Sequence, residues 1–107
     1  MNNRIATLLC AGVVSLFVLG STAHASTDCS VNLSKVWAGD DGHVWMLYTN
    51  GGSSYVTPSD PDTKNILALA TMALMGNKTL TVRYVANSVA CASTGRNDVV
   101  GVYLNNN

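Results

Sequence analysis

The chain contains no glutamate, and charged residues make up only 11% of its 107 residues, with acids and bases in equal number. A chain this neutral and sparsely charged offers no basic surface for nucleic acid. The low charge also argues against a solitary, highly soluble monomer. The composition therefore favours a domain that is covered by partners, and we expect no nucleic-acid ligand.

Histidine and cysteine are too scarce for a metal centre. His43 is the only histidine after residue 25, whereas a metal site needs several ligands at suitable spacing. His43 with Asp40 or Asp41 and a serine has the residue types of a hydrolytic triad, but no G-x-S-x-G motif is present. We expect no catalysis, no metal and no cofactor.

The first 25 residues have the parts of a secretory signal peptide. Arg4 supplies the positive start, an apolar run follows over Ile5–Leu19, and Ala23-His24-Ala25 is a small-residue cleavage motif. The run is short for a membrane-spanning helix, and Cys10 lies too early in it for a lipoprotein. We expect cleavage after Ala25, no membrane insertion, and one domain over residues 26–107 in the periplasm or outside the cell.

Export leaves two cysteines, Cys29 and Cys91, in an oxidising compartment. A domain of this size buries too little surface to be stable without a staple or a partner. We therefore predict a Cys29–Cys91 disulfide, which closes a long loop and stabilises the fold by on the order of 4 kcal/mol.

The pattern predicts a mainly β fold with one helix (α+β). Gly39–Gly42 and Asn50–Gly52 have turn composition, and the helix is expected from Pro61 to Gly76 with Asp60 as its cap. The expected strands are Leu33–Ala38, His43–Thr49, Ser53–Thr57, Thr79–Ala86 and Val99–Leu104. The order β-β-β-α-β-β is that of a five-strand OB-fold barrel.

The helix is more apolar than a surface helix should be, because Thr71 is its only polar residue between Ile66 and Met75. We expect Leu67, Ala70 and Leu74 to pack on the barrel. The other apolar positions need a second cover, and they are Ile66, Leu69, Met72, Ala73 and Met75. Either the helix is sunk deep in its own domain, or neighbouring subunits cover it; domain size favours the subunits.

Several strings together resemble a known family. They are DGHVWMLYTNGG, a Pro/Asp loop, LATMALMGNKTLTVRY, CAS and VVGVYL. The sequence resembles the B subunits of bacterial A–B toxins whose B component is a ring of five OB-folds. The type II heat-labile enterotoxin B subunits look most similar, and the cholera, subtilase and typhoid toxin B subunits look more distant.

The resemblance implies a pentamer in which the helices line a pore and edge strands pair between neighbours. It also implies a disulfide placed like Cys29 and Cys91, a host cell-surface glycan as receptor, and an enzymatic A subunit as cargo. Two departures weaken the match to any one receptor: the segment between Cys29 and Gly39 is short, and cholera toxin B has tryptophan and lysine where this chain has Ser93 and Arg96.

Two clusters have the short polar side chains that loops use to bind sugars. By resemblance to cholera toxin B, the first cluster comprises Thr57, Ser59, Asp60 and Asp62 together with Ser93, Thr94, Arg96 and Asn97. The second comprises Asn50, Ser53, Ser54 and Tyr55. Ordinary turn chemistry is the alternative for both, and we expect Trp37 and Trp45 to be core or interface residues.

These features predict a secreted, non-catalytic toxin-B-like subunit that forms a ring, binds glycans and delivers an enzymatic A subunit. One alternative is a small exported inhibitor or protein-binding domain, which predicts a monomer or dimer without glycan affinity. Another is a periplasmic OB-fold protein of the envelope, with a ligand groove on the strand face.

Overall fold

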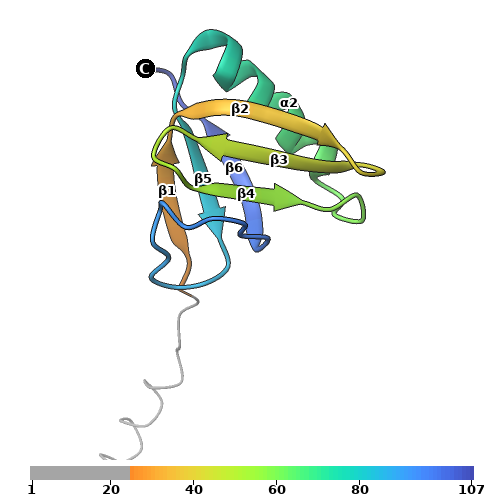
Figure 1. The fold of residues 1–107 in the computed structure, drawn as a ribbon. Helices are drawn as coiled ribbons and strands as arrows, with labels where there is room; N and C mark the ends of the chain where they lie inside the picture. The colour runs from red at the N-terminus through yellow and green to blue at the C-terminus, as the bar shows by residue number, and fades with distance from the viewer. Residues whose placement is uncertain (1–24) are drawn as a thin grey trace, which may run out of the picture.

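The computed structural model describes residues 25–107, which form six strands and one helix (Figure 1). In chain order these are β1 (Thr27–Val31), β2 (Leu33–Gly39), β3 (His43–Tyr48), β4 (Ser53–Val56), α2 (Thr63–Gly76), β5 (Leu80–Tyr84) and β6 (Val99–Leu104). The mainly β, one-helix prediction is confirmed. The predicted signal peptide, with its cleavage motif, lies almost wholly outside the described residues. Within residues 25–107 no helix is long and apolar enough to cross a membrane.

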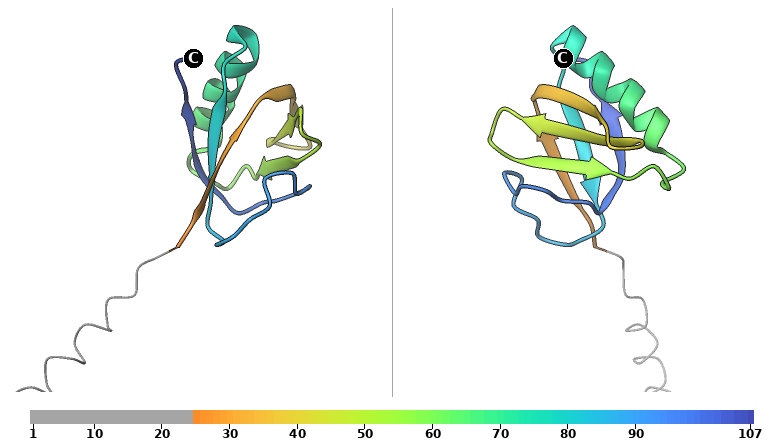
Figure 2. Two further views of the ribbon diagram at one scale, coloured as in Figure 1. Left: turned by 90° about the vertical axis from the view of Figure 1, so that its left-hand side faces the viewer. Right: turned by 45° about the vertical axis from the view of Figure 1, so that its right-hand side comes forward.

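The strands form two antiparallel sheets of three, in the orders β1-β5-β6 and β2-β3-β4. The expected closed five-strand barrel is not present. The sequence interpretation missed β1, which is short and carries polar residues at alternate positions: Cys29 and Val31 face the core, while Asp28 and Ser30 face outward. Only Asn32 separates β1 from β2, so one nearly continuous stretch of chain passes from one sheet into the other (Figure 2).

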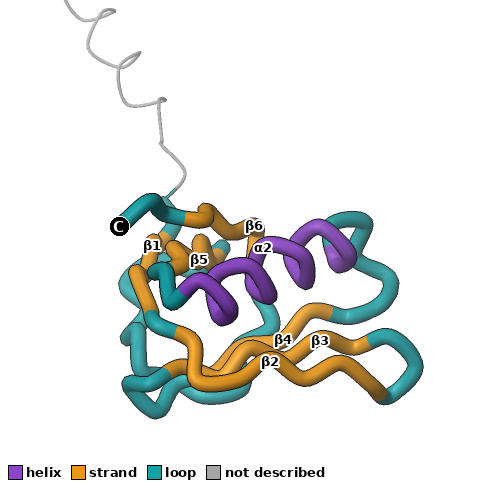
Figure 3. The backbone as a smooth tube through the Cα atoms, turned by 90° about the horizontal axis from the view of Figure 1, so that it is seen from above, coloured by secondary structure: helices purple, strands orange, loops and turns teal. Residues whose placement is uncertain are grey.

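The helix α2 lies across the opening between the two sheets, alongside β2 of one sheet and β6 of the other (Figure 3). Its inner face differs from the expected one: Ile66 and Ala73, predicted to lie at a subunit interface, are buried in the core of the same chain. The small side chains of Ala70 and Ala73 let the helix approach the sheets closely. These positions are therefore not available to a neighbouring subunit.

The remaining apolar positions of α2 are covered to different degrees. Leu69 is partly buried against the core, whereas Met72 and Met75 are 55% and 81% exposed. Leu67 and Leu74, which were expected to form the inner face, are also only partly buried. The domain thus covers about half of the helix by itself and leaves a methionine edge in contact with solvent.

Both ends of α2 have local explanations. The helix begins at Thr63 rather than at Pro61, and the residue at its N-cap is Asp62, so the prediction of Asp60 as the cap was wrong. The Asp60 carboxylate instead accepts a hydrogen bond from the Asp62 amide at 2.8 Å. At the end, Asn77 adopts the left-handed conformation with φ of 53°. The Lys78 amide then bonds to the carbonyl oxygen of the helix's last turn at Ala73, 2.9 Å away, which terminates the helix as the Gly-Asn pair predicted.

The core contains one buried polar cluster. The Tyr48 hydroxyl bonds to the Ser54 hydroxyl and lies 3.2 Å from the hydroxyl of Tyr84, and all three residues are almost fully buried. Burial raises the pKa of the Tyr48 phenol, so it stays neutral as its hydrogen bonds require. In the described part of the chain every buried side-chain polar atom has a partner. The cluster therefore links β3, β4 and β5 without an unpaired polar group.

The predicted disulfide is present between Cys29 and Cys91, with their Cα atoms 5.6 Å apart. It ties β1 to the long segment between β5 and β6, at a sequence separation of 62 residues. Thr27 adds two hydrogen bonds to the same segment, to the Ala86 carbonyl at 2.9 Å and from the Val89 amide at 3.1 Å. The N-terminal strand is thus joined to this segment by the disulfide at Cys29 and by the hydrogen bonds of Thr27.

Replacement of Cys91 by serine should lower the free energy of unfolding by on the order of 4 kcal/mol, because the unfolded chain regains the closed loop's entropy. Cys91 is exposed and Cys29 is buried, so this change removes the bridge without opening a core cavity. Denaturant unfolding of wild type, wild type with reductant and Cys91→Ser gives the measurement. An unchanged midpoint on reduction would contradict a stabilising bridge.

Candidate binding site on the outer face of a sheet

Strand alternation directs a row of aromatic side chains away from the core on the β2-β3-β4 sheet. In β3, Val44, Met46 and Tyr48 are buried, so Trp45 between them faces outward. The register pairs Trp37 of β2 with Trp45, and Trp45 with Tyr55 of β4. Three aromatic residues therefore lie side by side across three strands.

The Trp45 and Tyr55 rings stack on each other, with centroids 4.6 Å apart and planes inclined by 23°. Both side chains are half-buried. The His43 ring lies 6.1 Å from the Tyr55 ring on the same face. Aromatic stacking of this kind holds both rings in place, so the pair forms a fixed wall on the sheet.

Trp37 does not join this stack but lies over its own strand. A Cβ atom placed on Gly39 would come within 2.7 Å of the Trp37 ring, so the absence of a side chain at Gly39 allows the indole to lie against the backbone. In this position Trp37 is 44% exposed. The two tryptophans are cross-strand neighbours whose rings leave space between them.

That space is a hollow of about 350 Å³, which we call the tryptophan hollow. It is lined by Lys35, Trp37, Asp40, Trp45 and Leu47. Within residues 25–107 neither Lys35 nor Asp40 takes part in an ion pair, so the ammonium group and the carboxylate are free to meet a ligand. The hollow thus combines two indole surfaces with one hydrogen-bond donor group and one acceptor group.

The turn between β2 and β3 positions Asp40. Asp40 and Asp41 have φ of 52° and 60°, and the following Gly42 has φ of 107°. The turn is fastened by a hydrogen bond from the Gly42 amide to the Gly39 carbonyl at 3.2 Å, and Nδ1 of His43 lies 2.8 Å from the Asp40 carbonyl. These contacts hold Asp40 at the rim of the hollow.

The first predicted glycan cluster comes from two loops, one before α2 and one at residues 93–97. Thr57 bonds to Ser59 at 3.0 Å, and Asp60 is engaged with the Asp62 amide. In the described part of the chain no hydrogen bond connects these residues with those at 93–97. The group before α2 thus shapes the start of the helix.

The 93–97 segment instead lies beside β4 and meets the second predicted cluster (Figure 1). The Ser53 amide bonds to the Ser93 carbonyl at 2.9 Å, and the Tyr55 amide bonds to the Arg96 carbonyl at 2.8 Å. The edge of β4 is thereby covered. Thr94 and Asn97 are exposed on this segment.

Most side chains of the second cluster are used inside the protein. Asn50 donates to the Cys91 carbonyl at 3.1 Å and accepts from the Gly52 amide at 2.8 Å. The Ser53 hydroxyl accepts from the Gly95 amide at 2.9 Å, and Ser54 is fully buried. Only Tyr55 reaches the aromatic row, as part of the wall beside the tryptophan hollow.

Arg96 also has a role within the fold. Its guanidinium donates two hydrogen bonds to the Asp98 carboxylate, each 2.9 Å long, and lies 5.4 Å from the centre of the Tyr84 ring. The Arg96 hydrogen bonds hold the pKa of Asp98 below its ordinary value. Asp98 in turn accepts from the Ala86 amide at 3.0 Å. Arg96 thus fastens the segment before β6 and is not a free ligand group.

The sequence interpretation missed the tryptophan hollow because it assigned Trp37 and Trp45 to a core or an interface. The hollow's acid, Asp40, was considered as a turn residue and as a member of a hydrolytic triad, but not as a ligand-binding group. One sequence feature pointed toward the site: both faces of His43–Tyr48 are mostly apolar, although only one can face the core. Pairing this strand with Leu33–Gly39 through the intervening turn places Trp37 opposite Trp45.

In comparisons with known proteins, no family model matches this chain and no curated protein matches it. The function of the tryptophan hollow must therefore be inferred from its own chemistry.

Replacement of Gly39 by alanine should lift the Trp37 indole from the backbone, because the added methyl group occupies the space of the ring. We expect a shifted tryptophan emission maximum and an altered near-UV circular dichroism spectrum with unchanged far-UV signal. Gly101→Ala is the matched control, since a Cβ there has no neighbour within 4 Å. Identical spectra for Gly39→Ala and wild type would contradict this placement of Trp37.

Proposed function

We propose that the chain is a secreted, non-catalytic binding domain whose tryptophan hollow binds a cell-surface glycan. The observation that carries the proposal is the presence of two accessible indoles, a free ammonium group and a free carboxylate around one hollow of about 350 Å³. The hollow lies on two hydrogen-bonded strands, β2 and β3, and on the short turn that joins them. A rigid scaffold reduces the entropy lost on binding.

The chemistry of a sugar fits these groups. One side of a sugar ring presents C–H groups that pack on an indole, while its hydroxyls need both donors and acceptors. Lys35 supplies donors and Asp40 supplies acceptors at the rim of the hollow. A purely apolar ligand would leave both charges unused, so a polyhydroxylated ligand with an apolar face is the better match.

We extend the proposal to a ring of copies, five by the resemblance, that delivers an enzymatic A subunit after export to the periplasm or beyond. In this proposal the two sheets, which share the stretch from β1 to β2, are the halves of an OB-fold-like barrel. The support from the fold is the exposed edge of α2 at Met72 and Met75, next to the half-buried Leu69. Exposed apolar side chains grouped on one helix edge are typical of a contact surface.

The second candidate function is an exported protein-binding domain. The same observation favours it, because accessible tryptophans are the side chains that most often dominate protein–protein binding. Titration with a free oligosaccharide distinguishes the two functions, because only a glycan-binding domain should bind it saturably.

Glycan binding can be followed without a label, because the chain has only two tryptophans and both line the hollow. Glycan-array hits should be titrated against intrinsic fluorescence. We expect Trp37→Ala and Trp45→Ala each to weaken binding at least tenfold, which corresponds to about 1.4 kcal/mol. Tyr103→Ala on the other sheet, where the ring is also exposed, should leave affinity unchanged. Glycan binding that survives both tryptophan changes would overturn the assignment of the site.

Assembly is tested by the native mass of the exported protein and of Met72→Lys. A charge on the exposed edge of α2 should break the ring without damage to the core, whereas a change at Ala73 would disrupt the core itself. Asn65→Lys adds the same charge near the exposed start of the helix and is the control. A monomeric wild-type mass would overturn the ring, and a ring that tolerates Met72→Lys would overturn this contact edge.

A further inference from the structure

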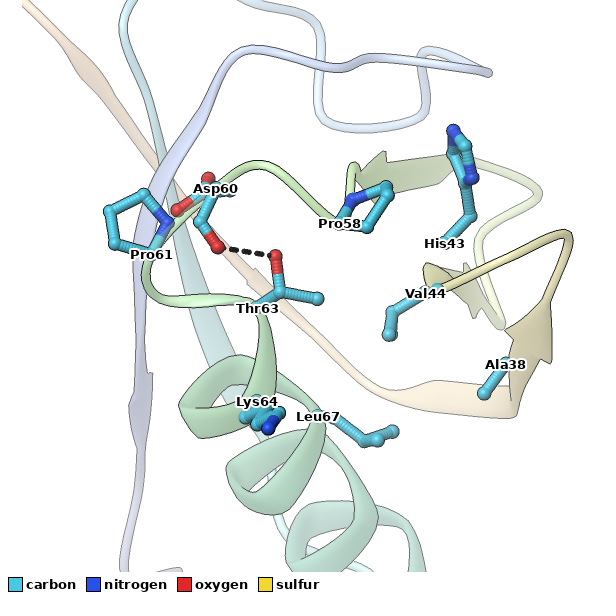
Figure 4. Close-up of a pocket in the computed structure, with 10 residues that line it drawn as sticks. Ala38, His43, Val44, Pro58, Asp60, Pro61, Thr63, Lys64 and Leu67 are labelled. Atoms are coloured by element: carbon cyan, nitrogen blue, oxygen red, sulfur yellow. Dashed lines mark hydrogen bonds between the residues drawn. The ribbon is translucent and has the colours of Figure 1, made fainter.

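A second cavity lies on the other face of the β2-β3-β4 sheet, between the start of α2 and the β2–β3 turn (Figure 4). Its volume is about 500 Å³. Ala38 and Val44, which are paired across β2 and β3, line it from the sheet, and Leu67 lines it from the helix. Because Trp37 and Trp45 alternate with these residues, the cavity and the tryptophan hollow are separate sites on opposite faces.

The interior of this cavity is apolar. Val44, Pro58 and Leu67 form walls around it. The Thr63 hydroxyl already donates to the Asp60 carbonyl at 2.9 Å, as the dashed line in Figure 4 shows. The Thr63 hydroxyl therefore does not call for a ligand partner. The His43 ring also lines the cavity, and its Nδ1 lies 2.8 Å from the Asp40 carbonyl. The space suits a hydrocarbon or aromatic body.

The mouth of the cavity carries one free cation. Lys64 lines the cavity from the first turn of α2, and within residues 25–107 it forms no ion pair. A cation at this end of a helix is opposed by the helix dipole, so a favourable dipole contact does not account for it. The Asp60 carboxylate at the same mouth is held by the Asp62 amide, and it turns away from the walls in Figure 4.

We propose that this cavity binds a small amphipathic anion, either an aryl or a short alkyl carboxylate. The apolar body lies between Val44, Pro58 and Leu67, and the carboxylate pairs with the Lys64 ammonium group. This site goes beyond the proposed glycan function, since it uses the opposite face of the sheet and none of the groups that line the tryptophan hollow.

The test uses the exported, disulfide-bonded protein and two probes of the same shape, 3-phenylpropanoate and the neutral 3-phenylpropanol. In ¹⁵N–¹H spectra we expect both probes to shift the amide signals of Gly42, Val44, Lys64 and Leu67. The carboxylate should bind about two- to fivefold more tightly, which is the range for a solvent-exposed ion pair. Shifts that appear only around Trp37 or Met75, or no saturable shifts at all, would overturn the site.

Variants test the apolar cavity and the Lys64 ion pair separately. Ala38→Leu places a larger side chain in the cavity from the exposed end of β2 and should abolish binding of both probes. Lys64→Gln should remove the advantage of the carboxylate and leave 3-phenylpropanol binding unchanged. Met75→Gln, at the far end of the helix, should change neither. Equal affinity of the two probes for wild type would overturn the role of Lys64, and glycan titrations report on the other face independently.

Discussion

The register between β2 and β3 is the constraint on which both candidate sites depend. Because side chains alternate along a strand, a slip of one residue would move Trp37 to the face that carries α2 and Ala38 to the outer face. The register is fixed by the turn over Gly39–Gly42, where two aspartates and a glycine in succession adopt positive φ. Asp40 of this turn lines one site and Gly42 lines the other. A single short turn thus sets the geometry on both faces of the sheet.

The helix shows how a small domain can bury much of an apolar segment by close packing against its two sheets. Alanines at positions 70 and 73 let α2 come close to both sheets, and Ile66 fills the space between them. This close approach explains why the helix can be almost wholly apolar without exposing all of it. What remains outside, at Met72 and Met75, is a narrow edge rather than a full face. Any partner of the helix therefore meets flexible methionines and not the branched side chains of the inner face.

Sequence patterns predicted the helix, its glycine-asparagine end, five of the strands and the disulfide, because each has a strong local signal. They did not predict β1, in which polar residues occupy every outward position and only Cys29 and Val31 are buried. The inner face of the helix was predicted correctly at Ala70, but the burial of Ile66 and Ala73 was missed, and Leu67 and Leu74 are only partly buried. Size favours burial on average, but close packing against two sheets favours small residues.

The candidate site was harder to predict than the fold, since it depends on pairings between strands. The polar loop residues favoured by the sequence bond largely to the protein itself, as Asn50, Ser53 and Arg96 do. Whether a side chain is free for a ligand depends on neighbours that are distant in sequence. Composition could suggest sugar-binding residue types, but it could not show that Trp37 and Trp45 share one exposed hollow.

The pairing of β1 with β5 has a consequence for how the protein is made. Thr27 pairs with Tyr84, so β1 cannot pair until β5, which lies much later in the sequence, has been synthesised. Until then β1 is an unpaired edge, and Cys91, the disulfide partner of Cys29, has not yet been synthesised. Slow formation of such distant contacts exposes intermediates to aggregation. A cell that makes this protein needs to keep the chain apart from other copies until β5 and Cys91 have been synthesised.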